Sequence, residues 1–133
     1  GKMTGRPIAI LGAGNVGVAL ARAWIAQGES VVFGVPSPDK YRDAVAALGS
    51  SATIGSTPSA IDAAEIVVLA TPYGAALDIA RSVTDWNGRI LVDATNPLAP
   101  GLGGLLVGTT TSGAEQIAAV AHGARVETLM RFA

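Results

Sequence analysis

Three glycines, Gly12, Gly14 and Gly17, stand between a short apolar segment and a longer alanine-rich one. The first segment, residues 7–11, has the length and composition of a buried strand, and the second, residues 15–27, carries apolar residues at helical spacing. In a strand–turn–helix unit the first glycine permits a tight turn, the second lets a pyrophosphate approach the backbone, and the third lets the helix pack close to the strand. The spacing therefore predicts that the chain opens with a βαβ unit.

The rest of the chain alternates short apolar runs with longer alanine-rich stretches, which is typical of parallel βαβ units. Further strands are predicted at residues 30–35, 52–54, 65–70, 89–94 and 125–129. Further helices are predicted at residues 37–48, 57–63, 74–83 and 112–121, and a long loop at residues 96–111. We expect one α/β domain over residues 1–133: a doubly wound, mostly parallel sheet of the Rossmann type with helices on both faces.

Composition narrows the classes of partner. Half of the residues are hydrophobic, 14% are charged and the net charge is −1, so the chain has neither a disordered composition nor the positive charge that attracts nucleic acid or anionic lipid. No apolar run approaches the length that spans a bilayer. There is no cysteine and one histidine, which argues against a disulfide framework or a metal site. We expect a cytoplasmic protein that binds small-molecule cofactors, because no signal-peptide pattern precedes the first strand.

The glycine turn is the strongest candidate site. Free backbone amides and the positive end of a helix dipole would face a pyrophosphate there. The candidate residues are consecutive: Gly12, Ala13, Gly14, Asn15, Val16 and Gly17. The alternative is a glycine-rich turn that serves only close packing of strand and helix.

The end of the second strand bears on the choice of dinucleotide. NAD-binding domains usually place an acid there to hold the ribose 2′-hydroxyl. Here the strand ends in Pro36 and Ser37, and Asp39 is expected in the first helical turn. Ser37 and Lys40, with Arg42 as a more distant candidate, could instead accept a 2′-phosphate. NADP is therefore favoured over NAD, although Ser37 could be only a helix cap and Lys40 only a solvated charge.

Two further turns follow strands at the same edge of the predicted sheet. The first contains Ala70, Thr71 and Pro72, and the second contains Asn96. Thr71 and Asn96 could bond a ribose or carboxamide, and Tyr73 could stack on a ring. The alternative is that these residues only form turns, for which Thr-Pro and Asn-Pro are common.

No convincing acid, base or nucleophile set is present. His122 precedes a glycine at a predicted helix end, and Asp93 is expected to accept hydrogen bonds from loop amides. We expect Trp24 in the core and Trp86 at the sheet edge. Hydride transfer between cofactors needs placement rather than a catalytic side chain, so we predict no catalytic residue and no metal ligand.

The segments IAILGAGNVGVALARAW, EIVVLATPYGAALD and ILVDATNPL, within about residues 7–126, resemble the family of NADP-dependent oxidoreductases that transfer hydride to or from the 5-deazaflavin coenzyme F420. The resemblance implies NADP at the glycine turn and the end of the second strand, with the deazaflavin entering over the nicotinamide. By position it assigns Ala13, Asn15 and Val16 to the pyrophosphate. It assigns Ser37 and Lys40 to the adenosine phosphate, and Thr71, Pro72 and Asn96 to the nicotinamide end.

The sequence departs from that family in two places. Pro36 and Ser37 occupy a segment where members often carry an arginine, and residues 127–133 lack the VKAFN-like continuation. We therefore expect the C-terminal part of the family pattern to be missing.

The main hypothesis is an oxidoreductase domain transferring hydride between NADP(H) and a 5-deazaflavin or flavin. The alternatives are a non-catalytic or truncated dinucleotide-binding module, and an imine or 3-hydroxyacid reductase that would need a further helical domain. Apolar Leu105, Leu106 and Phe132 favour a homodimer.

Overall fold

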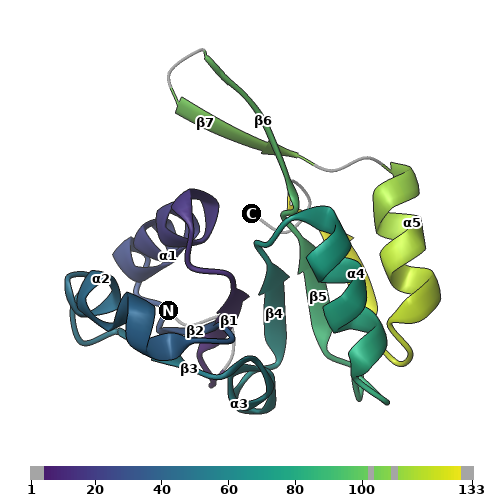
Figure 1. Cartoon of the computed structure of the whole chain (residues 1–133), viewed down its shortest axis with the longest axis horizontal. Coiled ribbons are helices and arrows are strands. Elements are labelled where there is room, and N and C mark those ends of the chain that lie inside the picture. The colour runs from purple at the N-terminus through teal and green to yellow at the C-terminus, as the bar shows by residue number, and fades with distance from the viewer. Residues whose placement is uncertain (1–4, 102–103, 109–110, 130–133) are drawn as a thin grey trace.

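Six parallel strands form the central sheet of the computed structural model, which describes residues 5–101, 104–108 and 111–129 (Figure 1). Their order across the sheet is β3-β2-β1-β4-β5-β8, so the direction of winding reverses between β1 and β4. The strands are β1 (Ile8–Leu11), β2 (Val31–Gly34), β3 (Ala52–Gly55), β4 (Ile66–Leu69), β5 (Ile90–Asp93) and β8 (Arg125–Thr128). The predicted doubly wound sheet is confirmed, and each of its strands lies where the sequence placed it.

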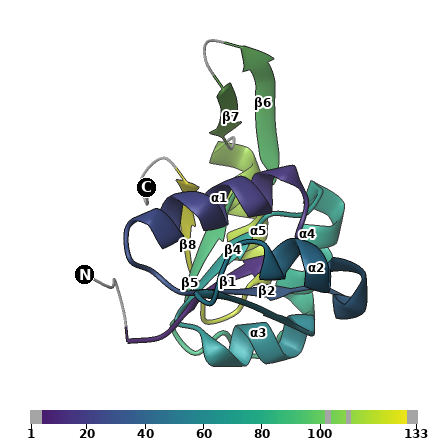
Figure 2. The same ribbon diagram turned by 90° about the vertical axis from the view of Figure 1, so that its left-hand side faces the viewer.

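Helices cover both faces of the sheet, as Figures 1 and 2 show. They are α1 (Asn15–Ala26), α2 (Arg42–Ala46), α3 (Thr57–Ala63), α4 (Tyr73–Ser82) and α5 (Thr111–Val120), with a 3-10 helix η1 (Pro38–Tyr41) before α2. Helices α1 and α2 contribute to one hydrophobic core, and α3, α4 and α5 contribute to the other.

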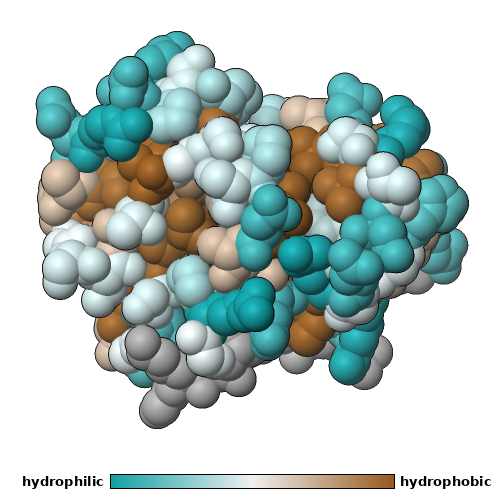
Figure 3. All heavy atoms as spheres, turned by 90° about the horizontal axis from the view of Figure 1, so that it is seen from below, coloured by the Kyte–Doolittle hydropathy of each residue, from teal (hydrophilic) through white to brown (hydrophobic). Residues whose placement is uncertain are grey.

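The four inner strands, β2, β1, β4 and β5, each supply both cores with alternate residues. In β4, Ile66 and Val68 belong to the core under α1, whereas Val67 and Leu69 belong to the core under α3 to α5. Both faces are buried, which explains why the strand reads as a continuous apolar run rather than an alternating one. The edge with the amino ends of the strands shows apolar and polar residues side by side (Figure 3).

Three expectations need correction. Residues 96–111 contain an antiparallel ribbon, β6 (Asn96–Gly101) and β7 (Gly104–Gly108), where a loop was predicted. Two prolines in β6 lower its strand propensity, but the outer edge of a ribbon tolerates a residue without an N–H.

The helix predicted at 37–48 is divided, because Tyr41 leaves helical geometry at φ −118° between η1 and α2. Trp86 is fully buried in the second core, where its Nε1 donates to the Ala80 carbonyl at 3.0 Å, rather than at the sheet edge. Trp24 lies in the first core as expected.

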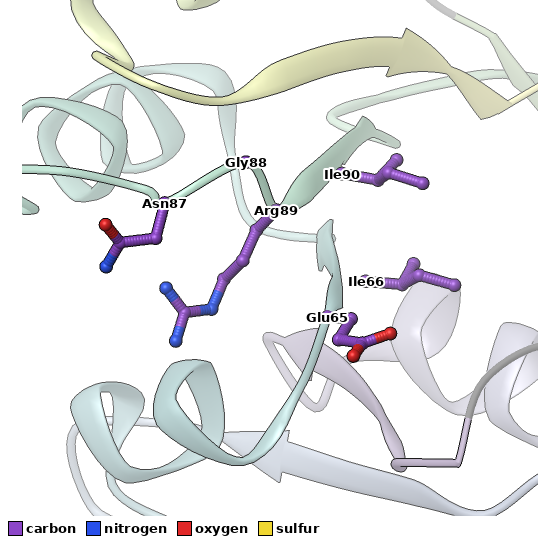
Figure 4. A pocket seen from close by; sticks show the side chains of 6 residues that line it. All are labelled: Glu65, Ile66, Asn87, Gly88, Arg89 and Ile90. Atoms are coloured by element: carbon purple, nitrogen blue, oxygen red, sulfur yellow. The ribbon is translucent and has the colours of Figure 1, made fainter.

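A hollow of about 300 Å³ lies at the amino ends of β4 and β5, on the opposite edge from the glycine turn (Figure 4). Arg89 extends along it, with its Nε donating to the Ala64 carbonyl at 3.0 Å and its Nη1 to the Trp86 carbonyl at 3.2 Å. Ala64 ends α3 and Trp86 precedes β5, so the guanidinium joins two connections at this edge. We assign Arg89 a structural role.

Arg89→Met keeps the aliphatic stem and removes both hydrogen bonds, so we expect the free energy of unfolding to fall by about 1–3 kcal/mol. Arg81→Met is the matched control, since Arg81 is exposed and pairs with Asp78, at 3.4 Å within α4. Its expected effect is below about 0.5 kcal/mol. Urea unfolding of the three proteins measures both values, and equal losses would contradict the assigned role.

Candidate functional site

The carboxyl ends of β1, β4 and β5 lie in one row. Leu11 pairs with Leu69, and Leu69 pairs with Asp93, so the turns that follow these residues emerge side by side. The Ala70 amide donates to the Leu11 carbonyl at 2.9 Å, and the Gly12 amide donates to the Gly34 carbonyl at 3.2 Å. The glycine turn therefore sits where the winding reverses, the usual ligand position in doubly wound sheets.

Two of the three glycines are required by the protein's own packing. Gly12 has φ +112°, and a Cβ there would come within 2.5 Å of the Ala70 carbonyl oxygen. A Cβ on Gly17 would overlap the Gly12 carbonyl oxygen. These contacts bring α1 against the turn and the turn against the residues after β4, as the spacing predicts for the first and third glycines.

Gly14 differs from its neighbours. It precedes α1 with φ −85°, which any residue adopts, and apart from its two chain neighbours no described atom lies within 4 Å of the position a Cβ would take. Neither side-chain capping bonds nor acidic residues occupy the first turn of α1. The first amides of the helix have no partner within the helix, so this open space faces unused donors and the positive end of a dipole.

Two cavities flank the turn after β4. The first, of about 380 Å³, is lined by Gly14, Asn15, Val16, Ala70, Thr71, Pro72, Ala94 and Thr95. The second, of about 410 Å³, is lined by Gly12, Gly34, Val35, Pro36, Thr57, Pro58, Thr71, Ala75, Asp78, Ile79 and Ser82. Thr71, in the turn after β4, lines both cavities. The two cavities are therefore neighbours at this residue.

The first cavity brings together six of the residues singled out in the sequence and adds Ala94 and Thr95. The second adds residues of α3 and α4 that sequence reasoning missed. Close packing of α3 on β2 brings them there: a Cβ on Gly34 would come within 2.7 Å of the Ala60 Cβ and 3.2 Å of the Thr57 Cα. Gly34 at the end of β2 was the one signal in the sequence that another segment, here α3, packs closely against this strand.

Asp93 is fully buried and holds the start of the next connection. Its Oδ1 accepts hydrogen bonds from the Thr95 amide at 3.0 Å and the Thr95 hydroxyl at 2.7 Å. The expected acceptor role is confirmed, and the carboxylate orients a residue of the first cavity. Asn96 begins β6 directly afterwards, and its side chain lies outside the part of the structure that is described.

The residues expected at a 2′-phosphate follow the second cavity in the sequence. Pro36 lines that cavity, and Ser37 and Lys40, which come after it in the chain, are both exposed. Asp39 lies in the first turn of η1 as predicted. Its carboxylate pairs with Arg42, whose Nε lies 2.6 Å from Oδ1.

Tyr73 lies near the cleft but contacts α5. Its hydroxyl lies 2.6 Å from Gln116 Oε1 and 3.2 Å from the Gly113 carbonyl oxygen, which ties the start of α4 to α5. This placement does not support the stacking role expected from the sequence. His122 is exposed in the turn after α5, and Gly123 beside it has φ +82°.

Within the described residues, no His, Asp or Glu side chains gather in a group of three that could hold a metal ion. Over the same part of the chain, none of the helices combines the length and apolarity needed to cross a bilayer.

The sheet order and the glycine turn define a Rossmann-type α/β domain. The family model described as NADP oxidoreductase, coenzyme F420-dependent, matches residues 7–97, and the chain belongs to this family. This confirms the resemblance found in the sequence. No curated protein gives a significant match.

Solved structures share the fold. A hypothetical protein from Sinorhizobium meliloti is 28% identical, with a TM-score of 0.74 over 92% of this chain and 60% of that one. A candidate F420-dependent NADP reductase from Arthrobacter sp. FB24 is 26% identical, with a TM-score of 0.65 over 93% and 61%. A reductive aminase from Aspergillus terreus, solved with NADPH and ethyl levulinate, is 22% identical, with a TM-score of 0.71 over 94% and 40%. The chain thus spans less than two thirds of the length of each.

The glycine contacts predict losses of stability of different size. Gly17→Ala forces a Cβ into the Gly12 carbonyl, so we expect it to lower the free energy of unfolding by about 1–3 kcal/mol. Gly14→Ala adds a Cβ in open space and is expected to cost less than about 1 kcal/mol, through poorer helix capping alone. Thermal or urea unfolding distinguishes them, and a Gly14 variant as unstable as the Gly17 variant would refute the packing argument.

Proposed function

We propose that this chain is the NADP(H)-binding domain of an oxidoreductase that transfers hydride between the nicotinamide and a second redox partner, a 5-deazaflavin coenzyme. The observation that carries the proposal is Gly14: the fold does not need a glycine there, yet a side chain would fill space that faces the start of α1. Membership of the NADP oxidoreductase family supports the identity of the ligand.

The turn from Gly12 to Gly17 fits a pyrophosphate. Its anionic oxygens would accept hydrogen bonds from the first amides of α1, with Ala13, Asn15 and Val16 beside Gly14. The first turn of α1 carries no acid, so no carboxylate of that turn would repel the pyrophosphate. Backbone amides at a helix N-terminus are a common anion site, and they fit this group here.

The two cavities fit the two halves of a dinucleotide. We assign the nicotinamide half to the first cavity, with Ala70, Thr71 and Pro72, and by position Asn96. We assign the adenosine half to the second cavity, between Pro36 and Ile79. Volumes of about 380 and 410 Å³ lie within the range of small-molecule sites, and a molecule bridging them would pass Thr71 and Gly14.

The bound nicotinamide supplies the hydride, and the protein supplies its placement. Alanine, valine and proline side chains contribute much of the first cavity wall, so a ring held there would pack mainly against apolar atoms. Thr95 is fixed in that wall by Asp93, at 2.7 Å between Oγ1 and Oδ1. Neither residue needs to gain or lose a proton for hydride transfer.

The proposal of a deazaflavin as the second substrate rests on the family and on likeness to the Arthrobacter protein. The test is to mix the protein with NADPH and the deazaflavin and to monitor reduction of the deazaflavin by its loss of absorbance. NADPH binding with no deazaflavin reduction would instead identify a non-catalytic binding module. Binding of neither NADPH nor NADH would refute the proposed function.

Gly14→Val should weaken NADPH binding at least about tenfold, because its side chain would occupy the space proposed for the pyrophosphate. Gly5→Val is the matched control: Gly5 also has no atom within 4 Å of a Cβ, but it precedes β1 at the opposite edge of the sheet. Fluorescence titration with NADPH measures both. Equal affinities of the two variants for NADPH would mean that the coenzyme does not bind at Gly14.

Lys40→Ala should weaken NADPH binding about two- to fivefold and leave NADH binding unchanged, because an exposed ammonium would contact only the 2′-phosphate. Arg125→Ala removes the same charge from β8, which lies at the far edge of the sheet from β2 and β3. Paired titrations give the NADPH to NADH ratio for each protein. An unchanged ratio in Lys40→Ala would remove Lys40 from the phosphate site.

A further inference from the structure

Arg89 is a partly buried cation that pairs with no carboxylate among the described residues. Its guanidinium donates to backbone carbonyls, those of Ala64 and Trp86, through Nε and Nη1. In contrast, a carboxylate lies beside each of Arg6, Arg42, Arg81 and Arg125. Removing a charge from water without a counter-ion is unfavourable, and a guanidinium has more donors than these two bonds use. Arg89 therefore keeps a charge and a donor group, Nη2, for a ligand.

Arg89 lines a second hollow besides the one described above. This hollow has a volume of about 260 Å³ and lies between α3, the end of α4 and the connection to β5. Asn87 and Arg89 line both hollows. Figure 4 shows their side chains pointing to the same side, away from those of Ile66 and Ile90. A carboxamide and a guanidinium are thus available to the same ligand.

The connection that carries these two side chains is held in place by α5 and the turn after it. The Trp86 amide donates to the His122 carbonyl at 2.8 Å, and the Gly88 amide donates to the Gly123 carbonyl at 2.7 Å. The Arg89 side chain is fixed in turn by its own two bonds. Donors held in this way lose little freedom when a ligand binds.

Two carboxylates line the same hollow. Asp85 holds its own turn, because its Oδ1 accepts from the Asn87 amide at 2.9 Å. Asp62 is exposed on α3 and has no hydrogen bond or ion pair within the part of the chain that is described. A dianion such as phosphate would meet both carboxylates, which disfavours it. A molecule with one carboxylate and one ammonium group matches this mixture of charges.

The remaining lining of the hollow restricts the body of such a molecule. Pro58, Ile61 and Val83 contribute apolar atoms to the wall. Small-molecule sites usually combine an apolar wall with a few placed polar groups, and a hollow of this volume admits only a small ligand. The body is therefore expected to be short and aliphatic.

We propose that this hollow binds an amino-acid zwitterion with an aliphatic side chain. The carboxylate accepts hydrogen bonds from Nη2 of Arg89 and from the Asn87 carboxamide, and the ammonium group donates to Asp62. The aliphatic side chain contacts Pro58 and Val83. Because Pro58 also lines the second cavity, the amino acid lies beside the space assigned to adenosine. The site is separate from that assignment and needs no bound coenzyme.

Nuclear magnetic resonance of the isotope-labelled chain during titration with L-leucine tests the proposal. We expect saturable amide shifts at Asp62, Asn87 and Arg89, and little change at Gly14 and Asn15. Isocaproate lacks the ammonium group and isoamylamine lacks the carboxylate, so each should bind at least about tenfold more weakly than leucine. The absence of saturable shifts at the first three residues would overturn the proposal. So would shifts centred on Gly14, or an analogue that binds as tightly as leucine.

Variants assign the roles of the side chains. Asp62→Asn keeps the shape and removes the charge, so it should raise the dissociation constant of leucine at least about fivefold. Asp43→Asn is the matched control: Asp43 is also exposed, but it lies on α2, which packs on the other face of the sheet. Equal affinities of these two variants for leucine would contradict the role of Asp62.

Asn87→Gly tests the donor side of the site without altering Arg89, which also supports the fold. Asn87 has φ +53°, a conformation that glycine adopts readily, so the backbone is kept and only the carboxamide is lost. We expect leucine binding to weaken about two- to fivefold. Unchanged affinity in Asn87→Gly would contradict the assigned contact with the carboxylate.

Discussion

The close approach of three backbone segments at the carboxyl edge controls the architecture of the candidate site. The turn after β1 lies against the residues after β4 at Gly12, and α1 lies against that turn at Gly17. Neither approach leaves room for a Cβ. The helix start is thereby held beside the first cavity, and the space at Gly14 stays open there. A site of this kind is built by the absence of side chains rather than by a set of reactive ones.

The buried sheet makes this edge rigid. Strands β1 and β4 contribute residues to cores on both faces, and their carboxyl ends are aligned by hydrogen bonds such as that from the Ala70 amide to the Leu11 carbonyl at 2.9 Å. Asp93 extends the same row to β5 by holding Thr95. The turns that we assign to the coenzyme are thus anchored to the most deeply buried strands, which suits a reaction that requires placement.

Much of this arrangement could be read from the sequence, because apolar runs, glycine spacing and capping residues act locally. The turn from Gly12 to Gly17 and the buried acceptor Asp93 are examples. What could not be read depends on contacts between distant segments. Thr57 and Pro58 reach the second cavity only because α3 packs on Gly34, and Tyr73 turns toward Gln116 on α5. The ribbon at residues 96–108 was missed because prolines and glycines, which usually mark loops, are tolerated in a strand pair with free edges.

The central claim is that the amides at the start of α1 bind the pyrophosphate of NADP(H). Nuclear magnetic resonance of the isotope-labelled chain during titration with NADP tests it residue by residue. The account predicts the largest amide shifts at Gly14, Asn15 and Val16, with further shifts at Ala70 and Thr71, and little change at Gly88 and Arg89 on the opposite edge. Shifts confined to that opposite edge, or none at saturating nucleotide, would contradict it.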